Sequence, residues 1–357
     1  MNATPTTVIP AKAGIHNTVS LETPFGYPLS RERQSRWWRA GALFALAVCT
    51  LSPVAHAQPY PVKPIRFIVP WTPGSGTDLM SRMLAQRLSE PLGQPVVVDN
   101  RGGAGAIIGT EAAAKALPDG YTIYVGGSVS MAISPVLYKK VAYDPIKDFA
   151  PVSLMTKFFN AVALHPSVPA KSIKELIALS KAKPGELTFA SAGSGSTSHL
   201  SGELFMNMTG VKWVHVPYKG GGQSITGVLS GEAHMMLAPI STAAPHGKTG
   251  RMRVIAVTSA KRVASLPEIP TVNESGVPGF EYGGWQGLLT PAGVAPEMIA
   301  RLNGAVLKAI HTPEFKDYLQ QEGSELVGST PDAFGAFLRD EVVKHAKIVR
   351  SAGIKPQ

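Results

Sequence analysis

Cysteine is nearly absent from this chain of 357 residues, which contains Cys49 and no other. A single thiol excludes a disulfide within the chain and any metal site built from several cysteines. Charged residues are also scarce, at 16% of the sequence, whereas apolar residues reach 44%. A disordered chain has the opposite balance, so the composition indicates a globular protein. Its length predicts two domains.

Acidic residues are outnumbered by basic ones, 24 against 34, which gives a formal net charge of +10. The basic residues are scattered and form no run of five or more. No aromatic and basic module of the kind that reads nucleic acid is present, so we expect no nucleic-acid partner. A mild positive field would instead attract a small anionic solute.

The N-terminal part of the chain has the three sections of a secretory signal peptide. Four arginines within residues 31–39 precede an apolar run at 40–51, and Ala55-His56-Ala57 supplies a small-residue cleavage pattern. The apolar run is too short for a helix that spans about 30 Å of hydrocarbon. We expect cleavage after Ala57, which removes Cys49 and releases residues 58–357 into the periplasm.

Two alternatives for this segment stay open. Residues 46–49, Leu-Ala-Val-Cys, resemble a lipobox, so a lipid anchor on Cys49 is the rival route, although Val48 is unusual before such a cysteine. Some thirty residues also precede the basic stretch. The start of translation could therefore lie inside the printed sequence.

Strands and helices alternate through the rest of the chain, which predicts an α/β fold made of βαβ units with parallel sheets. Strands are expected at 65–70, 96–98, 121–125, 187–190, 211–216, 233–237 and 253–258. A first helix is expected after Asp78, which could cap it, a second is expected to end at residue 117, and a third is expected to begin at residue 172. Further helices are expected at 199–208, 222–229, 296–310, 313–322 and 330–350.

Two glycine-rich turns follow strands and precede helices, at 74–78 and 191–198. Such a turn presents free backbone N–H groups at the positive end of a helix, where an anion binds. Ligands of open α/β sheets also lie at the carboxyl ends of the strands. With one turn in each domain, the pattern predicts a cleft that holds an anion from both sides.

Enzyme and cofactor motifs fail on inspection. Residues 103–109 resemble a dinucleotide fingerprint, but no strand ending in an acidic residue follows at the required distance. His246-Gly247-Lys248-Thr249 lacks the first P-loop glycine, because Thr242 stands in its place. No Gly-x-Ser-x-Gly elbow accompanies the serines before His199, and no pair of histidines has metal-ligand spacing. We therefore expect no catalysis, no cofactor and no metal.

An ordered set of motifs resembles Bug-type periplasmic receptors of the tripartite tricarboxylate transporter family. The resemblance is collinear over residues 59–350. It rests on Tyr60-Pro-Val-Lys-Pro-Ile-Arg-Phe-Ile-Val-Pro70, Pro73-Gly74-x-x-x-Asp78, Val98-Asp-Asn-Arg-Gly-Gly-Ala-Gly105, Pro118-Asp-Gly-Tyr-Thr122, Ser191-Ala-Gly-Ser-Gly-Ser196 with His199-Leu200, His215-Val-Pro-Tyr-Lys-Gly220 and Pro267-x-x-Pro-Thr-x-x-Glu-x-Gly276.

The resemblance implies a two-domain, type II-like periplasmic binding protein whose Rossmann-like lobes are joined by two crossing strands, near 158–165 and 282–289. The first domain would comprise 58–158 plus 285–357, and the second 159–284. It further implies a small carboxylate ligand, and a large and a small membrane permease subunit as partners of a monomeric receptor. A solute sensor is the alternative function, and a periplasmic α/β hydrolase is a third.

The residues expected to bind the ligand lie in the two glycine-rich turns and in the three positions before the first turn, with Ser128 and Ala238 added. The full set is Trp71, Thr72, Pro73, Gly74, Ser75, Gly76, Thr77, Asp78, Ser128, Ser191, Ala192, Gly193, Ser194, Gly195, Ser196 and Ala238. Many family members carry an acidic residue at the place of Ala238, where it meets an amino group on the ligand. Alanine there argues against an amino-acid ligand.

Overall fold

The structure is a computed structural model that describes residues 60–351 and residue 354. The described residues form one compact unit. The predicted signal peptide, Cys49 and the cleavage point after Ala57 lie outside the described residues. Among the described helices, none is both long enough and apolar enough to cross a membrane.

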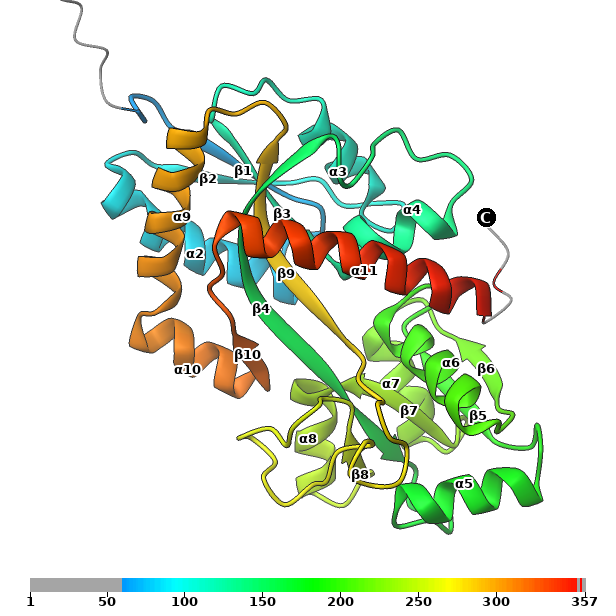
Figure 1. Ribbon diagram of the computed structural model, residues 1–357. Helices are drawn as coiled ribbons and strands as arrows, with labels where there is room; N and C mark the ends of the chain where they lie inside the picture. The colour runs from blue at the N-terminus through cyan, green and yellow to red at the C-terminus, as the bar shows by residue number, and fades with distance from the viewer. Residues whose placement is uncertain (1–59, 352–353, 355–357) are drawn as a thin grey trace, which may run out of the picture. The chain divides into compact units, whose positions relative to one another are not determined.

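Strands and helices alternate along the chain as expected (Figure 1). The strands are β1 (Ile65–Val69), β2 (Val96–Asn100), β3 (Thr122–Gly127), β4 (Phe149–Leu164), β5 (Thr188–Ser191), β6 (Val214–Pro217), β7 (Met235–Pro239), β8 (Arg253–Val257), β9 (Gly283–Pro291) and β10 (Ser324–Leu326). The helices are α2 (Gly76–Leu92), α3 (Ile107–Ala114), the π-helical turn η1 (Ser128–Ile133), α4 (Ser134–Leu137), α5 (Ile173–Ala182), α6 (Thr197–Thr209), α7 (Gly221–Leu229), α8 (Ile240–Lys248), α9 (Pro296–Ile310), α10 (Pro313–Gln321) and α11 (Pro331–Ser351).

The strands form two lobes that share β4. The order is β2-β1-β3-β9-β4-β7-β5-β6, and β8 and β10 also pair with β4. In the first lobe β1, β2 and β3 are parallel, whereas β9 is antiparallel to both β3 and β4. In the second lobe β5, β6 and β7 are parallel. The predicted two-lobe α/β fold with crossing strands is therefore confirmed.

The crossing strand β4 is longer than predicted. It has 16 residues and begins at Phe149, whereas the sequence indicated a strand only from residue 158. It pairs with β9 as far as Phe159 and with β7 from Asn160 onward, so one strand belongs to both lobes. Pro151 stands near the start of this strand, although proline is rare inside strands. The pairing shifts its register between Pro151 and Ser153, which accommodates the proline.

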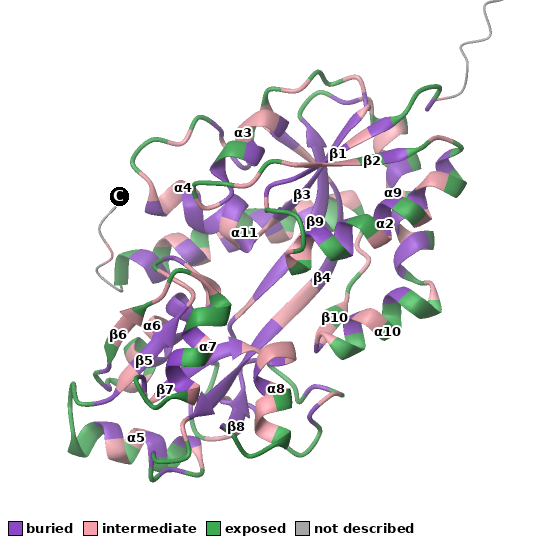
Figure 2. Cartoon of the chain, turned by 180° about the vertical axis from the view of Figure 1, so that it is seen from behind, coloured by how far each residue is buried: buried purple, intermediate pink, exposed green. Residues whose placement is uncertain are grey.

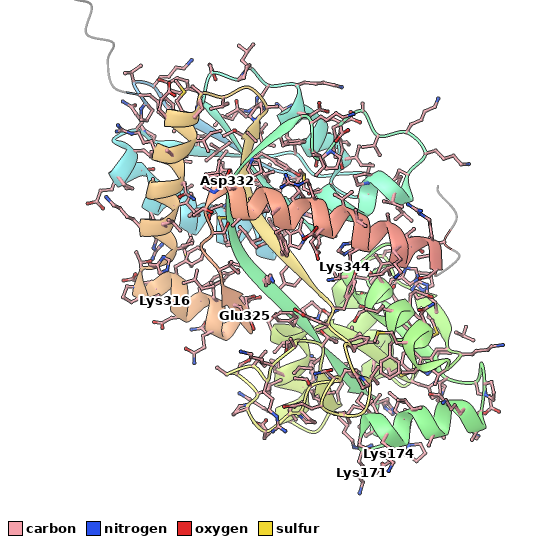
Figure 3. All side chains as sticks on the ribbon, in the orientation of Figure 1. Lys171, Lys174, Lys316, Glu325, Asp332 and Lys344 are labelled. Atoms are coloured by element: carbon pink, nitrogen blue, oxygen red, sulfur yellow. The ribbon has the colours of Figure 1, made fainter. Side chains whose placement is uncertain are left out.

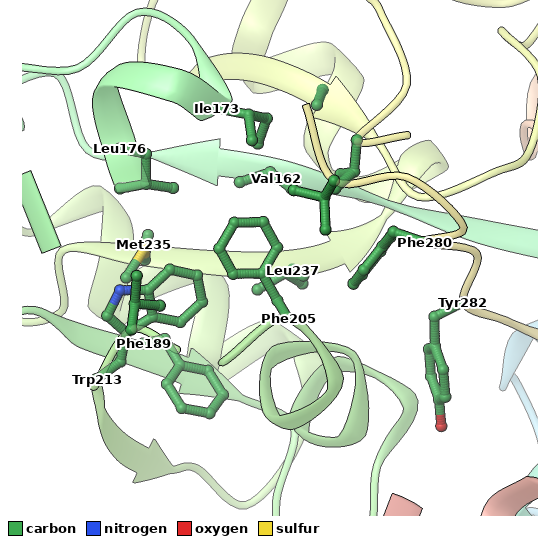
Figure 4. Packing of buried hydrophobic residues seen from close by; sticks show 14 of the residues in the cluster. Val162, Ile173, Leu176, Phe189, Phe205, Trp213, Met235, Leu237, Phe280 and Tyr282 are labelled. Carbon is green, nitrogen blue, oxygen red and sulfur yellow. The ribbon is translucent and has the colours of Figure 1, made fainter. Parts of the chain in front are cut away.

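Each lobe has its own apolar core between its strands and the helices that cover them (Figure 2). In the first lobe Phe67 and Leu84 pack with Phe315, and in the second lobe Phe189 packs with Phe205, as Figure 4 shows. The second core also receives side chains from elements that flank the first lobe, namely Ile133 and Leu137 of η1 and α4, and Ile348 and Val349 of α11. These contacts tie η1, α4 and α11 to the second lobe.

Two local predictions were wrong. Ser75, not Asp78, caps α2, because its hydroxyl accepts the Asp78 N–H at 3.2 Å. The chain also forms α8 at Ile240–Lys248, where no helix was expected, because Pro245 stands in it and proline usually ends a helix.

Candidate functional site

The turn between β1 and α2 is built around Asp78, a residue that is only 1% exposed. One carboxylate oxygen accepts the Gly74 N–H at 2.8 Å and the Arg82 guanidinium at 3.0 Å, and the other accepts the Asn100 amide at 2.8 Å. Burial alone would raise the pKa of Asp78, but the hydrogen bonds from Arg82, Gly74 and Asn100 overcome it and lower that pKa. The carboxylate is thus occupied in shaping the turn.

Gly76 and Thr77 stand in the first turn of α2. Within the part of the chain that the structure describes, neither of their N–H groups has an acceptor. The Thr77 hydroxyl accepts a hydrogen bond from the Gln286 amide of β9 at 2.7 Å, which fixes the helix start against a crossing strand. This helix start therefore presents two free donors and the positive end of a helix of 17 residues.

The start of α2 lies in a cleft of about 690 Å³ between the lobes. The first lobe contributes Trp71, Ser75, Gly76, Thr77 and Met80, together with Tyr318, Leu319, Glu322 and Ser324; the crossing strands contribute Thr156, Phe158, Phe159 and Gln286; the second lobe contributes Gly221, Pro239, Ser241 and Thr242. A smaller pocket of about 50 Å³ adjoins it and also contains Trp71, Thr77, Phe158 and Gln286. Ser128 lies in this inner pocket.

The walls of the cleft are uncharged apart from one acid. Among the described residues that line it, none is lysine, arginine or histidine, and Glu322 is the carboxylate. Burial, and then the nearby Glu322, raise the pKa of Tyr318 to about 12, so this phenol stays protonated. Basic side chains such as Lys171, Lys174 and Lys316 are exposed on the outside of the molecule (Figure 3). An anion in the cleft would therefore be held by backbone and hydroxyl dipoles.

The second turn, between β5 and α6, is held by a set of hydrogen bonds within the second lobe. Ser196 caps α6 by accepting the His199 N–H at 3.3 Å, and its hydroxyl also donates to the Gly193 carbonyl at 2.6 Å. The Ser198 hydroxyl accepts the Ala192 N–H at 3.1 Å. Ser194 is exposed, in contrast to its neighbours.

Gly195 brings the second turn against the first-lobe side. Its φ of +79° suits glycine, and a Cβ at this position would meet the side chain of Leu137 in α4. The turn at 191–196 thus faces the segment η1–α4, which begins at Ser128. Its residues do not share the lining of the 690 Å³ cleft with Trp71 and Thr77.

The structure brings together Trp71, Ser75, Gly76, Thr77 and Ser128 along the cleft and its inner pocket. The buried Asp78 carboxylate holds this turn in place through its hydrogen bonds to Gly74 and Asn100. Thr72, Pro73 and Gly74 are exposed at the tip of the turn. Ala238 is fully buried in β7, among apolar side chains of the second lobe.

Several cleft residues were absent from the predicted set. Phe158 and Gln286 lie on the predicted crossing strands, so their position between the lobes could have indicated them. Ser241 and Thr242 stand in the first turn of α8, directly after β7. They were missed because that helix was missed. Tyr318 and Glu322 come from the end of α10, where the sequence carries no distinguishing pattern.

One serine and one histidine make a contact that resembles a hydrolase pair. The Ser191 hydroxyl lies 2.6 Å from Nε2 of His215. A nucleophile has to reach its substrate, yet Ser191 is 0% exposed, and its oxygen also accepts the Gly193 N–H at 3.1 Å. The pair is therefore arranged to hold the turn. Within residues 60–351, no group of three or more His, Cys, Asp or Glu side chains could hold a metal ion.

Comparison with known proteins identifies the family of this chain. The model of the tripartite tricarboxylate transporter family receptor, TctC, matches residues 80–354. Protein BugT of Bordetella pertussis is 35% identical over 311 residues, which are 87% of this chain and 95% of BugT.

Two solved structures share the fold over nearly their whole length. R. palustris Rpa4515 with adipate has a TM-score of 0.74 and 34% identity, and the match covers 84% of this chain and 100% of that one. MatC from Rhodopseudomonas palustris with bound malate has a TM-score of 0.70 and 29% identity, over 81% and 100% of the two chains. The chain belongs to the TctC family of tripartite tricarboxylate transporter receptors, the Bug-type periplasmic solute-binding proteins.

Proposed function

We propose that this protein captures a small carboxylate in the cleft between its lobes and delivers it to a membrane permease, without chemical change to the ligand. The observation that carries the proposal is the start of α2, where the N–H groups of Gly76 and Thr77 lack acceptors among the described residues and face a cleft without a cationic side chain. A carboxylate that loses its water there gains oriented donors in return. Relatives solved with adipate and with malate support this ligand class.

The ligand should need no amino group. Ala238 offers no charge, and it is buried among apolar side chains. Phe158, Phe159 and Met80 give the cleft apolar walls beside its donors. A carboxylate with a neutral carbon chain fits this combination.

Calorimetry and thermal-shift measurements on residues 58–357 test the ligand class. The probes are adipate, malate, succinate and benzoate, together with aspartate as the 2-amino counterpart of succinate. We expect carboxylates without an amine to stabilise the protein by binding only the folded state, and aspartate to stabilise it less than succinate does. Stabilisation by amino acids alone would overturn the proposal, as would no response to any carboxylate.

We further propose that the receptor acts in the periplasm as a monomer, after cleavage behind Ala57, and serves a large and a small permease subunit. The order of basic residues, apolar run and Ala-x-Ala supports export. N-terminal sequencing of periplasmic protein should start at Gln58, and a lipid-modified Cys49 at the N-terminus would contradict it. Loss of labelled carboxylate uptake after deletion of the gene separates transport from sensing, because a pure sensor leaves the permease working.

A further inference from the structure

His199 lies directly beneath the turn at 191–196 and is only 4% exposed. Its Nδ1 accepts the Gly195 N–H at 3.1 Å, and its Nε2 lies 3.4 Å from a carboxylate oxygen of Glu203. An Nδ1 that accepts a backbone hydrogen bond carries no proton, so the ring proton belongs on Nε2, toward Glu203.

A second histidine holds the other end of the same turn. His215 of β6 stacks on His199 with ring centroids 3.9 Å apart, and its Nε2 contacts the Ser191 hydroxyl. Phe189 of β5, labelled in Figure 4, stacks on His215 at 4.9 Å. The two imidazoles therefore hold the turn at Ser191 and Gly195. Among the described residues, Glu203 and His215 are the titratable groups that contact His199.

The inward hydrogen bond of Gly195 decides which donors the turn shows to solvent. The Ser196 N–H is bonded to the Gly193 carbonyl at 3.1 Å, and the Gly195 N–H is bonded to His199. In the described structure the N–H groups of Ser194, Thr197 and Ser198 have no acceptor. These three are the donors that a carboxylate oxygen could use.

We propose that His199 is a positioning residue for solute binding: its unprotonated Nδ1 holds the Gly195 peptide inward and leaves the N–H groups of Ser194, Thr197 and Ser198 free for a carboxylate oxygen. The turn at 191–196 does not line the cleft in this structure, so these donors would reach the ligand when the lobes close over it. The proposal rests on the proposed function, since it assigns this turn to the ligand site. It differs from a mere packing role, in which only the ring volume and the stack on His215 would matter.

Two variants separate these roles. In His199→Asn the side-chain oxygen takes the place of Nδ1 and keeps an acceptor for the Gly195 N–H. In His199→Gln the amide reaches the place of Nε2, keeps a partner for Glu203 and loses that acceptor. Both lose the ring and its stack. Glutamine is the better helix former, so a packing role predicts that it is tolerated at least as well as asparagine.

Calorimetry with adipate and malate, with the melting temperature of each variant measured alongside, decides between them. We expect His199→Asn to bind within about threefold of the unchanged protein and His199→Gln to bind about tenfold more weakly, the effect of one lost hydrogen bond. Glu203→Gln, which keeps an acceptor for Nε2–H, is the matched control and should bind normally. Equal or tighter binding by His199→Gln than by His199→Asn would overturn the positioning role.

A readout without ligand keeps the proposal testable if neither carboxylate binds. NMR of protein labelled with ¹⁵N-histidine should show His199 with a bare Nδ1 and a protonated Nε2. The Gly195 amide should exchange slowly in the unchanged protein and in His199→Asn, and faster in His199→Gln. A protonated Nδ1, or equal exchange in all three proteins, contradicts the proposal. Failure of adipate and malate to bind, with these NMR results as expected, counts against the ligand class alone.

Discussion

His215 links the turn at 191–196 to pH. Burial, and then the neighbouring His199, lower the pKa of His215 to about 4. In the unfolded chain this histidine takes up a proton near its ordinary value of 6.5, so between these values the unfolded state binds more protons. We expect the free energy of unfolding to be highest above pH 6.5 and to fall by about 1–2 kcal/mol toward pH 4, after allowance for the partial exposure of the ring.

His215→Gln isolates this contribution, because it keeps an amide near the Ser191 hydroxyl and does not titrate. Urea unfolding at several pH values between 4 and 7 should show a flatter dependence in the variant than in the unchanged protein. If the free energy of unfolding changes with pH equally in both proteins, groups other than His215 cause the pH dependence.

Asp78 shows how far a single residue can be predicted. The sequence places an acid near a helix start, and the structure confirms a helix there but gives the cap to Ser75. Both residue types cap helices well, and the Asp78 carboxylate is instead bound by the Asn100 amide of β2. A contact between residues so far apart in the chain leaves no local pattern.

At the scale of elements, the turn between β5 and α6 tests whether backbone or side-chain groups bind the anion. Ser194→Ala removes an exposed hydroxyl and should change affinity by at most about 1 kcal/mol, whereas Ser194→Pro removes one of the free N–H groups and should cost more. Ser196→Ala removes the α6 cap, so it should also lower the free energy of unfolding by about 1 kcal/mol.

Calorimetry for binding and thermal unfolding for stability, on these three variants, separate the effects. Loss of binding in Ser194→Ala as large as that in Ser194→Pro would show that the hydroxyl, not the backbone N–H, contacts the ligand.

Elements with a strong local signal were predicted almost to the residue. Helix α9 carries an apolar stripe and a proline at its first position, and it occupies Pro296–Ile310 as expected. The turn η1 was missed, since Ser-Val-Ser-Met-Ala-Ile reads as easily as the continuation of a strand. Of the residues that line the cleft, the predicted set contains those of the first glycine-rich turn and lacks the side chains that come from α8 and α10. The proposed domain boundaries, 58–158 plus 285–357 and 159–284, stay a prediction.

At the scale of the whole molecule, we predict that ligand closes the two lobes about the crossing strands. A carboxylate held from only one side keeps part of its surface in water, so the closed state gains contacts that the open state lacks. Small-angle scattering on residues 58–357, with and without saturating adipate or malate, should show a smaller radius of gyration in the bound protein. An unchanged radius at saturation would argue against closure, and a probe that does not bind in calorimetry serves as the control.

The place of β9 between β3 and β4 has a consequence for chain synthesis. The first lobe's sheet lacks a central strand until residues 283–291 exist, whereas β5, β6 and β7 of the second lobe all lie within 188–239. A chain cut short before Gly283 would keep the strands of the second lobe but leave β3 and β4 each with an open edge. Unpaired edges recruit other strands, so such fragments should aggregate, and the second lobe should form before the first.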